Sequence, residues 1–211
     1  MNVLAMDTAT PAPSIVVLSG ERIFEESLSG DRRASEELLP AVARALAQAG
    51  LRLADIDRVA VCSGPGSFTG VRVGLATAWG FGRALGVDVE AVSTLEAMAE
   101  GARGLGADRA LAVLDAGRGE VIAERFDLTS PRARSLGAAG RAAPDAVSAQ
   151  ASGDPIVALP REIVPGAFDA PLPGVAASLA RAVAREPRPG GAMDAIYARP
   201  SAAEEKHVDA P

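Results

Sequence analysis

The residues best placed to do chemistry lie in one glycine-rich stretch, CSGPGSFTGVRVG, at positions 62–74. A glycine-rich turn between an apolar strand and a helix often binds phosphate through its backbone amides. A Walker A loop also requires a Gly-Lys pair, and this sequence has none. The dinucleotide-binding pattern Gly-x-Gly-x-x-Gly begins at Gly64 and Gly66, but the next glycine, Gly70, comes one residue late. Both nucleotide-binding patterns are therefore incomplete.

The same stretch also has a structural interpretation. Ser67 or Thr69 would cap the following helix, and the glycines would supply the backbone freedom of a tight turn. An anion bound at the start of that helix is the alternative, because the first amides of a helix have no partner within it. The incomplete patterns favour the capped turn.

Two aspartates end similar apolar segments and are candidates for a vestigial cofactor site. The segment LAMD ends at Asp7, with Thr8 next to it, and the segment LAVLD ends at Asp115. Such carboxylates either organise a metal-bound nucleotide or cap a turn by accepting backbone N–H groups. Capping is favoured, because Arg118 follows the second aspartate closely and the sequence has no clear adenosine-binding motif.

The chain is poor in nucleophiles and metal ligands, with one cysteine, Cys62, and one histidine, His207. A His-dependent triad or a histidine-rich metal site cannot be built from these two residues. Cys62 ends an apolar run, which is typical of a small buried residue, and His207 lies in the acidic tail EEKHVDAP. We predict no catalytic residue and no metal ligand. A protease that uses Cys62 or a metal is the weakest alternative.

The elements that must position these residues follow from hydrophobic periodicity and turn signals. The first half predicts a three-stranded antiparallel meander, then a helix, a strand, a second helix and a further strand. Their residues are, in order, Asn2–Asp7, Ser14–Leu18, Arg22–Leu28, Glu36–Ala49, Arg58–Cys62, Val71–Leu85 and Val87–Val92.

The second half repeats the opening of the first, with a strand, an aspartate and a hairpin. It predicts strands at Leu111–Asp115, Gly119–Phe126 and Ile156–Leu159, a helix at Val175–Arg185 and a last strand at Ala195–Ala198. Two such halves match the α/β, two-lobed actin-like ATPase (ribonuclease H-like) fold, in which each lobe is β-β-β-α-β-α and the second is reduced here. We expect an N-terminal lobe at 1–98, a smaller lobe at 99–200 and a mobile tail at 201–211.

Small residues recur every four positions along the second predicted helix. The series Gly66, Gly70, Gly74, Ala78, Gly82 and Gly86 indicates that something approaches this side of the helix closely, either the sheet or another helix. Val71, Leu75 and Trp79 form a separate row beside the only charged residues of the helix, Arg72 and Arg83. We expect this row to meet another subunit, while packing on the first helix is the alternative. The predicted partner interface comprises Gly70, Val71, Arg72, Gly74, Leu75, Ala78, Trp79, Gly82 and Arg83.

Composition narrows the class of protein further. The net charge of −6 and the lack of a basic cluster argue against direct binding of nucleic acid. No apolar run is long enough to span a bilayer, and the first residues do not resemble a secretory signal. A single cysteine suits a reducing compartment, so we expect a cytoplasmic protein without a membrane partner.

Four segments resemble the TsaB (YeaZ) family: MNVLAMDTAT, SGPGSFTGVRVGLATAWGFGRALG, AVSTLEAMA and LAVLDAGRGEV. The resemblance is continuous over residues 1–127, and the segment 195–199 is a plausible trace of the C-terminal part of the family. It implies the two-lobed fold and a non-catalytic role in the synthesis of threonylcarbamoyladenosine in tRNA, with the tRNA contacted only indirectly.

The resemblance also implies partners and cofactors. A TsaD-type catalytic paralogue would carry the metal, a TsaE-type ATPase would join the complex, and ATP and metal would be bound by these partners rather than by this chain. Family members also form homodimers through helices of the first lobe. The His-x-x-x-His pair of TsaD-type subunits is absent here, because His207 is the only histidine. The alternative function is an actin-like ATPase or small-molecule kinase acting alone.

Overall fold

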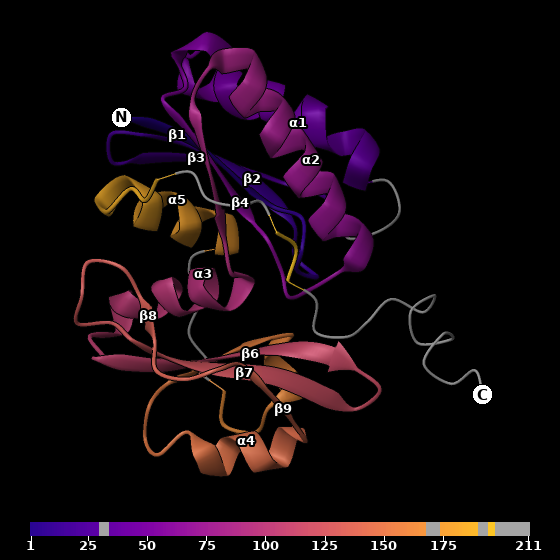
Figure 1. Ribbon diagram of the computed structural model, residues 1–211, viewed down its shortest axis with the longest axis vertical. Helices are drawn as coiled ribbons and strands as arrows, with labels where there is room; N and C mark the ends of the chain where they lie inside the picture. Colours follow the sequence, from indigo (N-terminus) through magenta and orange to yellow (C-terminus); the bar gives the residue numbers. More distant parts are fainter. Residues whose placement is uncertain (30–33, 168–173, 190–193, 197–211) are drawn as a thin grey trace.

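The computed structural model describes residues 1–29, 34–167, 174–189 and 194–196 of the 211-residue chain (Figure 1). The predicted tail 201–211, with His207, lies outside the described residues, as does the second half of the strand predicted at Ala195–Ala198. Ala195 and Ile196 are described and belong to no strand. Figure 1 shows two lobes, one above the other, each built on a β-sheet.

The first lobe contains a five-stranded mixed sheet with the order β3-β2-β1-β4-β5. β1, β2 and β3 form an antiparallel meander, whereas β1, β4 and β5 run parallel. The apolar residues Val3–Met6 of the central strand are fully buried, as expected for a strand covered on both faces. The strand bounds are β1 Asn2–Asp7, β2 Ser14–Ser19, β3 Arg22–Ser27, β4 Arg58–Cys62 and β5 Asp88–Val92.

Two helices cover one face of this sheet, α1 at Ala34–Ala49 and α2 at Phe68–Leu85 (Figure 1). α1 begins earlier than the predicted Glu36 and contains Pro40. α2 also begins earlier, because its cap is Ser67. A short 3-10 helix, η1 at Leu53–Asp55, leads from α1 to β4.

The second lobe repeats the central part of the first in reduced form. Its sheet has the order β10-β6-β7-β8, with β9 also pairing with β7. β6 forms a hairpin with β7 and pairs in parallel with β10, just as β1 forms a hairpin with β2 and pairs in parallel with β4. The bounds are β6 Arg109–Gly117, β7 Glu120–Asp127, β8 Arg134–Ser135, β9 Gly140–Ala142, α4 Pro144–Gln150 and β10 Ile156–Leu159.

Two helices form the layer between the sheets, α3 at Thr94–Gly101 and α5 at Val175–Arg185. α5 packs on β1, β2 and β4 of the first sheet, and α3 packs on α5 and on the β6–β7 hairpin. The boundary expected after residue 98 thus falls within α3, and α5 contacts the sheet of the other lobe. The 3-10 helices η2 (Ala102–Leu105) and η3 (Arg161–Ile163) follow α3 and β10.

The sheet order, the repeated hairpins and the order of elements confirm the predicted two-lobed ribonuclease H-like fold with a reduced second lobe. The third strand of the second lobe is represented only by the short β8 and β9. Within the described residues, no helix combines the length and the apolar character needed to cross a membrane.

Candidate functional site

The glycine-rich loop between β4 and α2 is tied to its own chain by backbone hydrogen bonds. The N–H of Ser63 donates to the carbonyl oxygen of Val92 (2.8 Å), and the N–H of Ser67 donates to that of Ala9 (2.8 Å). The carbonyl oxygen of Gly64 accepts from the N–H of Thr94 at 2.8 Å. These bonds join the loop to the turn after β1 and to the start of α3, which supports its structural interpretation.

Ser67 caps α2 through its side chain, as one of the two predicted caps. Its hydroxyl accepts a hydrogen bond from the N–H of Gly70 at 3.2 Å, and its carbonyl accepts the N–H of Val71 at 2.9 Å. The cap and the Ser67–Ala9 hydrogen bond therefore fix the start of α2 beside the turn after β1.

Gly70, Gly74 and Gly82 of α2 lie close against other parts of the same chain, which corrects their assignment to the partner interface. A Cβ atom at Gly70 would lie 1.8 Å from the carbonyl oxygen of Thr8, and one at Gly74 would lie 2.4 Å from the Thr8 hydroxyl. At Gly82 it would lie 2.2 Å from a methyl group of Val89. Minimal side chains at these positions let α2 lie close against the sheet. The sequence indicated that something packs closely against α2, but not that it is the chain's own sheet and the turn after β1.

Asp7 lies at the end of β1 and is fully buried. Its carboxylate accepts hydrogen bonds from the N–H groups of Ala9 (2.9 Å) and Thr10 (3.2 Å) and from the Thr10 hydroxyl. This is the turn-capping arrangement that the sequence favoured. Burial raises the pKa of Asp7 to about 6, although the hydrogen bonds from Thr10 and Ala9 act in the opposite direction.

Asp7→Asn is expected to stabilise the fold at pH 7.5 by about 1–3 kcal/mol. A folded-state pKa raised from 3.8 to about 6 means that the folded chain binds the proton more tightly than the unfolded chain. The free energy of unfolding of the wild type therefore falls as the pH rises from about 4 to 6, and stays lower above it. Urea unfolding of the wild type and Asp7→Asn at pH 4 and pH 7.5 measures the difference in their free energies of unfolding. A stabilisation that does not shrink towards pH 4 would contradict it.

Thr8 and Asp115 have different environments from that of Asp7. The hydroxyl of Thr8, which is buried, donates to the carbonyl oxygen of Gly70 at 2.7 Å and so fastens the first turn of α2. Asp115 is exposed at the irregular end of the β6–β7 hairpin, where it accepts the N–H of Gly117 at 2.7 Å. Each of the three candidates for a vestigial cofactor site thus stabilises local backbone.

Cys62 is fully buried at the end of β4. Burial, followed by the nearby charge of Asp7, raises the pKa of its thiol well above the ordinary value. A thiol held neutral in this way is a poor nucleophile. The described residues contain no group of three or more His, Cys, Asp or Glu side chains placed to hold a metal ion.

A thiol reagent at pH 8 is expected to modify Cys62 on the order of 100-fold more slowly in the native chain than in urea, because reaction requires local opening. Mass spectrometry of timed samples measures both rates. Equally rapid modification in the two conditions would contradict the buried, neutral thiol.

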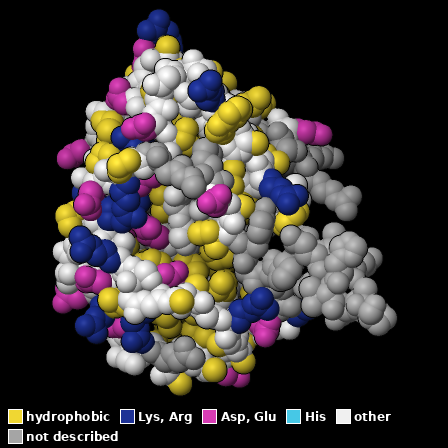
Figure 2. All heavy atoms as spheres, in the orientation of Figure 1, with side chains coloured by type: hydrophobic (Ala, Val, Ile, Leu, Met, Phe, Trp, Pro, Cys, Tyr) yellow, Lys and Arg dark blue, Asp and Glu magenta, His cyan; other side chains and the backbone are white. Residues whose placement is uncertain are grey.

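The exposed side of α2 and the neighbouring side of α1 form an apolar surface, which we call the α1–α2 face. Two large side chains project from it, Leu39 with 58% of its surface exposed and Trp79 with 59%. α1 and α2 lie side by side on the same face of the sheet (Figure 1), and Figure 2 shows hydrophobic side chains over α2. The other exposed residues of the face are Glu36, Pro40, Ala43, Ala47, Arg72, Ala76, Gly80, Arg83 and Ala84.

Only part of the predicted interface lies on this face. Arg72, Trp79 and Arg83 are exposed, and Arg72 stacks over the ring of Phe68 at 3.8 Å. Val71 and Leu75 are instead buried in the core, so the predicted row from Val71 to Trp79 does not face outwards as a unit. The remaining predicted residues are the small ones of the series that packs on the sheet, namely Gly70, Gly74, Ala78 and Gly82.

Leu39 of α1 lies on this face and was not among the predicted interface residues. Leu38 and Leu39 are adjacent in the helix, and since successive residues point about 100° apart, only one can face the core fully. Leu38 is buried and Leu39 is exposed. The pair of leucines, followed by alanines at 43 and 47, was the available signal for a second apolar side of α1.

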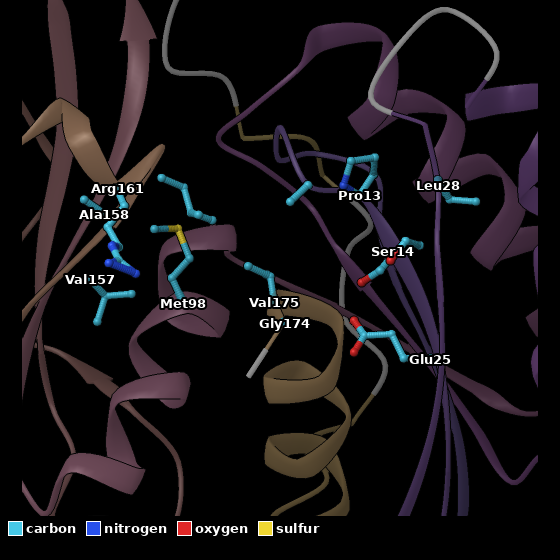
Figure 3. A pocket seen from close by; sticks show the side chains of 13 residues that line it. Pro13, Ser14, Glu25, Leu28, Met98, Val157, Ala158, Arg161, Gly174 and Val175 are labelled. Carbon is cyan, nitrogen blue, oxygen red and sulfur yellow. The ribbon is translucent and has the colours of Figure 1, made fainter. Parts of the chain in front are cut away.

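A cavity of about 490 Å³ lies between the lobes, away from the α1–α2 face. Figure 2 shows hydrophobic side chains gathered in this region, and Figure 3 shows Met98 and Val175 between Glu25 and Arg161. Its described lining residues do not include Asp7, Thr8 or Asp115. They are Ala12, Pro13, Ser14, Glu25, Ser27, Leu28, Met98, Val157, Ala158, Leu159, Arg161, Gly174 and Val175.

Comparison with solved structures identifies the family. YeaZ from Pseudomonas aeruginosa aligns with 93% of this chain and 99% of its own, with a TM-score of 0.76 and 30% sequence identity. The chain belongs to the TsaB/YeaZ family. Residues 28–162 also match the model of the family described as "TsaD: tRNA N6-adenosine threonylcarbamoyltransferase".

Curated sequences agree with membership of the TsaB/YeaZ family. The tRNA threonylcarbamoyladenosine biosynthesis protein TsaB of Escherichia coli is 41% identical over 57% of this chain and 53% of its own length. The TsaB protein of Bacillus subtilis is 32% identical over the same shares of the two chains. The match thus spans about half the length of these curated relatives.

Proposed function

We propose that this chain is a non-catalytic subunit in the synthesis of threonylcarbamoyladenosine in tRNA, and that it acts by pairing with a TsaD-type catalytic subunit. The observation that carries the proposal is the α1–α2 face, an exposed apolar surface in a member of the TsaB/YeaZ family. The curated relatives are named as biosynthesis proteins of this modification. An activity carried by a partner requires a surface that binds that partner.

The chemistry of the α1–α2 face suits binding to another helical surface. Trp79 is more than half exposed, and exposed tryptophans often become the residues that contribute most to an interface. Ala76 and Gly80 flank it with minimal side chains, which allow a partner helix to approach closely. Arg72 and Arg83 provide charge at the edge of the face, as in the polar rim of many interfaces.

The vestigial candidates support a non-catalytic role. Asp7 and Thr8 are buried and bonded to the chain's own backbone, so neither presents a group to a substrate. Cys62 is buried as a neutral thiol. We therefore assign metal binding, ATP use and tRNA contact to the TsaD-type and TsaE-type partners. A homodimer through the α1–α2 face would compete with the pairing.

The proposal is tested by measuring how much threonylcarbamoyladenosine the tRNA contains in cells that lack this chain. We expect the modified nucleoside to fall strongly by mass spectrometry of digested tRNA, and to return with the wild-type chain but not with Trp79→Asp. Unchanged modification in the deletion strain would overturn the proposed function. Recovery with Trp79→Asp would instead overturn the role of the α1–α2 face.

A further inference from the structure

A buried network of charges connects the two lobes. At its centre is Arg132, in the segment between β7 and β8, whose side chain is almost fully buried. Its guanidinium forms ion pairs with Glu90 of β5 at 2.7 Å and with Glu96 of α3 at 2.9 Å. It also donates to the carbonyl oxygen of Glu186, just after α5, at 3.0 Å. One side chain of the second lobe thus binds three elements that lie on or against the first.

A second centre of the network is Glu100 of α3, which is also buried. Its carboxylate pairs with Arg103 at 2.5 Å and with Arg185 of α5 at 3.0 Å, and it accepts the N–H of Ala133. Despite burial, these partners lower its pKa, so the carboxylate is charged at neutral pH. Arg185 and Arg103 also donate to the carbonyl oxygens of Pro131 and Leu128. The segment 128–133 is therefore fastened along its length.

The network also holds the chain after α5. The guanidinium of Arg188 pairs with Glu96 at 3.0 Å, and its backbone N–H donates to Glu90 at 3.1 Å. Its carbonyl oxygen accepts from Arg58 of β4 at 2.8 Å. Three glutamates and four arginines thus join β5, α3, the β7–β8 segment and the end of α5.

We propose that this network locks the two lobes in one fixed arrangement, so that the chain acts as a single rigid body. Relative motion of the lobes would separate Arg132 from Glu90 and Glu96, and it would leave buried charges without partners. Such separation is strongly unfavourable, because the interior does not solvate the charges. The cavity between the lobes consequently keeps a constant width, and the α1–α2 face keeps a constant position relative to the second lobe.

The test is a distance measurement between the lobes by double electron–electron resonance. Spin labels are attached at Ala84→Cys on α2 and Ala146→Cys on α4, two exposed helical positions, while the buried Cys62 stays unlabelled. We expect one narrow distance distribution in this labelled chain. Arg132→Met is expected to broaden it and to lower the melting temperature on the order of 10 °C.

The matched control is Arg125→Met, because the Arg125–Asp154 ion pair (3.3 Å) is partly exposed and lies within the second lobe. This change should leave the distribution narrow. If Arg132→Met does not fold, Glu90→Gln tests the same point, since it removes the charged partner of Arg132 on β5 and keeps the shape of the side chain. A broad distribution in the parent chain would overturn the proposal, and so would an unchanged one in folded Arg132→Met or Glu90→Gln.

Discussion

Trp79→Asp is expected to weaken pairing with a TsaD-type subunit strongly while the chain stays folded. Trp79 is 59% exposed on α2, so a polar replacement should change the free energy of unfolding by only about 0.5 kcal/mol. In a complex, the aspartate would bury a charge in an apolar contact and remove the largest side chain of the α1–α2 face. The expected loss of binding free energy is about 3 kcal/mol or more, roughly 100-fold in affinity.

Calorimetric titration with the purified partner measures this loss, with circular dichroism as the check on folding. The matched control is Leu136→Asp, because Leu136 is also a large exposed apolar residue (49%) but lies in the second lobe. It should bind as the wild type does. Equal weakening by both changes would show that the effect is not specific to the α1–α2 face. Full affinity in Trp79→Asp would place the interface elsewhere.

Gly70→Ala and Gly80→Ala are expected to change stability in opposite directions, although both lie in α2. At Gly70 the new methyl group would lie 1.8 Å from the carbonyl oxygen of Thr8, so the first turn of the helix must lift from the sheet. That movement also breaks the hydrogen bond from the Thr8 hydroxyl to Gly70. We expect a loss of about 3 kcal/mol. At Gly80 the methyl group meets nothing within 4 Å, and alanine should stabilise the helix by up to about 1 kcal/mol.

Urea unfolding of the two variants and the wild type compares these effects directly. Each variant is the control for the other, since the chemical change is the same and only the position differs. If Gly70→Ala were as stable as Gly80→Ala, the close contact between α2 and the turn after β1 would be wrong. The small residues of α2 could then contact a partner subunit instead of the chain's own sheet.

Most of the first lobe could be predicted from sequence, because the buried residues of its strands and helices are either continuous apolar runs or apolar residues on one side of the element. β1 and β4 are short runs bounded by turn residues, and α2 begins at a serine cap and ends before Gly86 in a left-handed conformation. α3 was not predicted as an element. α3 is only eight residues long, which is shorter than the window of roughly 11–18 residues in which a helical period is read.

The second lobe was predicted less completely for a different reason. β8, β9 and α4 lie in a segment rich in alanine, glycine and proline, where few large apolar residues mark a buried side. The charge network was also beyond prediction. Arg132 meets Glu90 and Glu96 across 42 and 36 positions of the chain, and no local pattern relates residues so far apart.

For the candidate site, the sequence indicated that α2 packs closely against something, but not that Gly70, Gly74 and Gly82 pack against the chain itself. Small residues at every fourth position of a helix indicate that another part of the structure packs closely against it. The sequence does not show whether that part is the sheet of the same chain or a helix of a partner. The structure distinguishes them because Gly70 and Gly74 contact Thr8. The exposed side is marked instead by Arg72, Trp79 and Arg83, the three predicted interface residues that remain on it.

Binding of a TsaD-type subunit to the α1–α2 face can be measured by amide hydrogen exchange of the chain with and without that purified subunit. We expect slower exchange on binding in peptides covering α1 and α2, with β6, β7 and α4 unchanged. Slower exchange confined to the second lobe, or no complex at all, would show that the α1–α2 face does not bind this subunit.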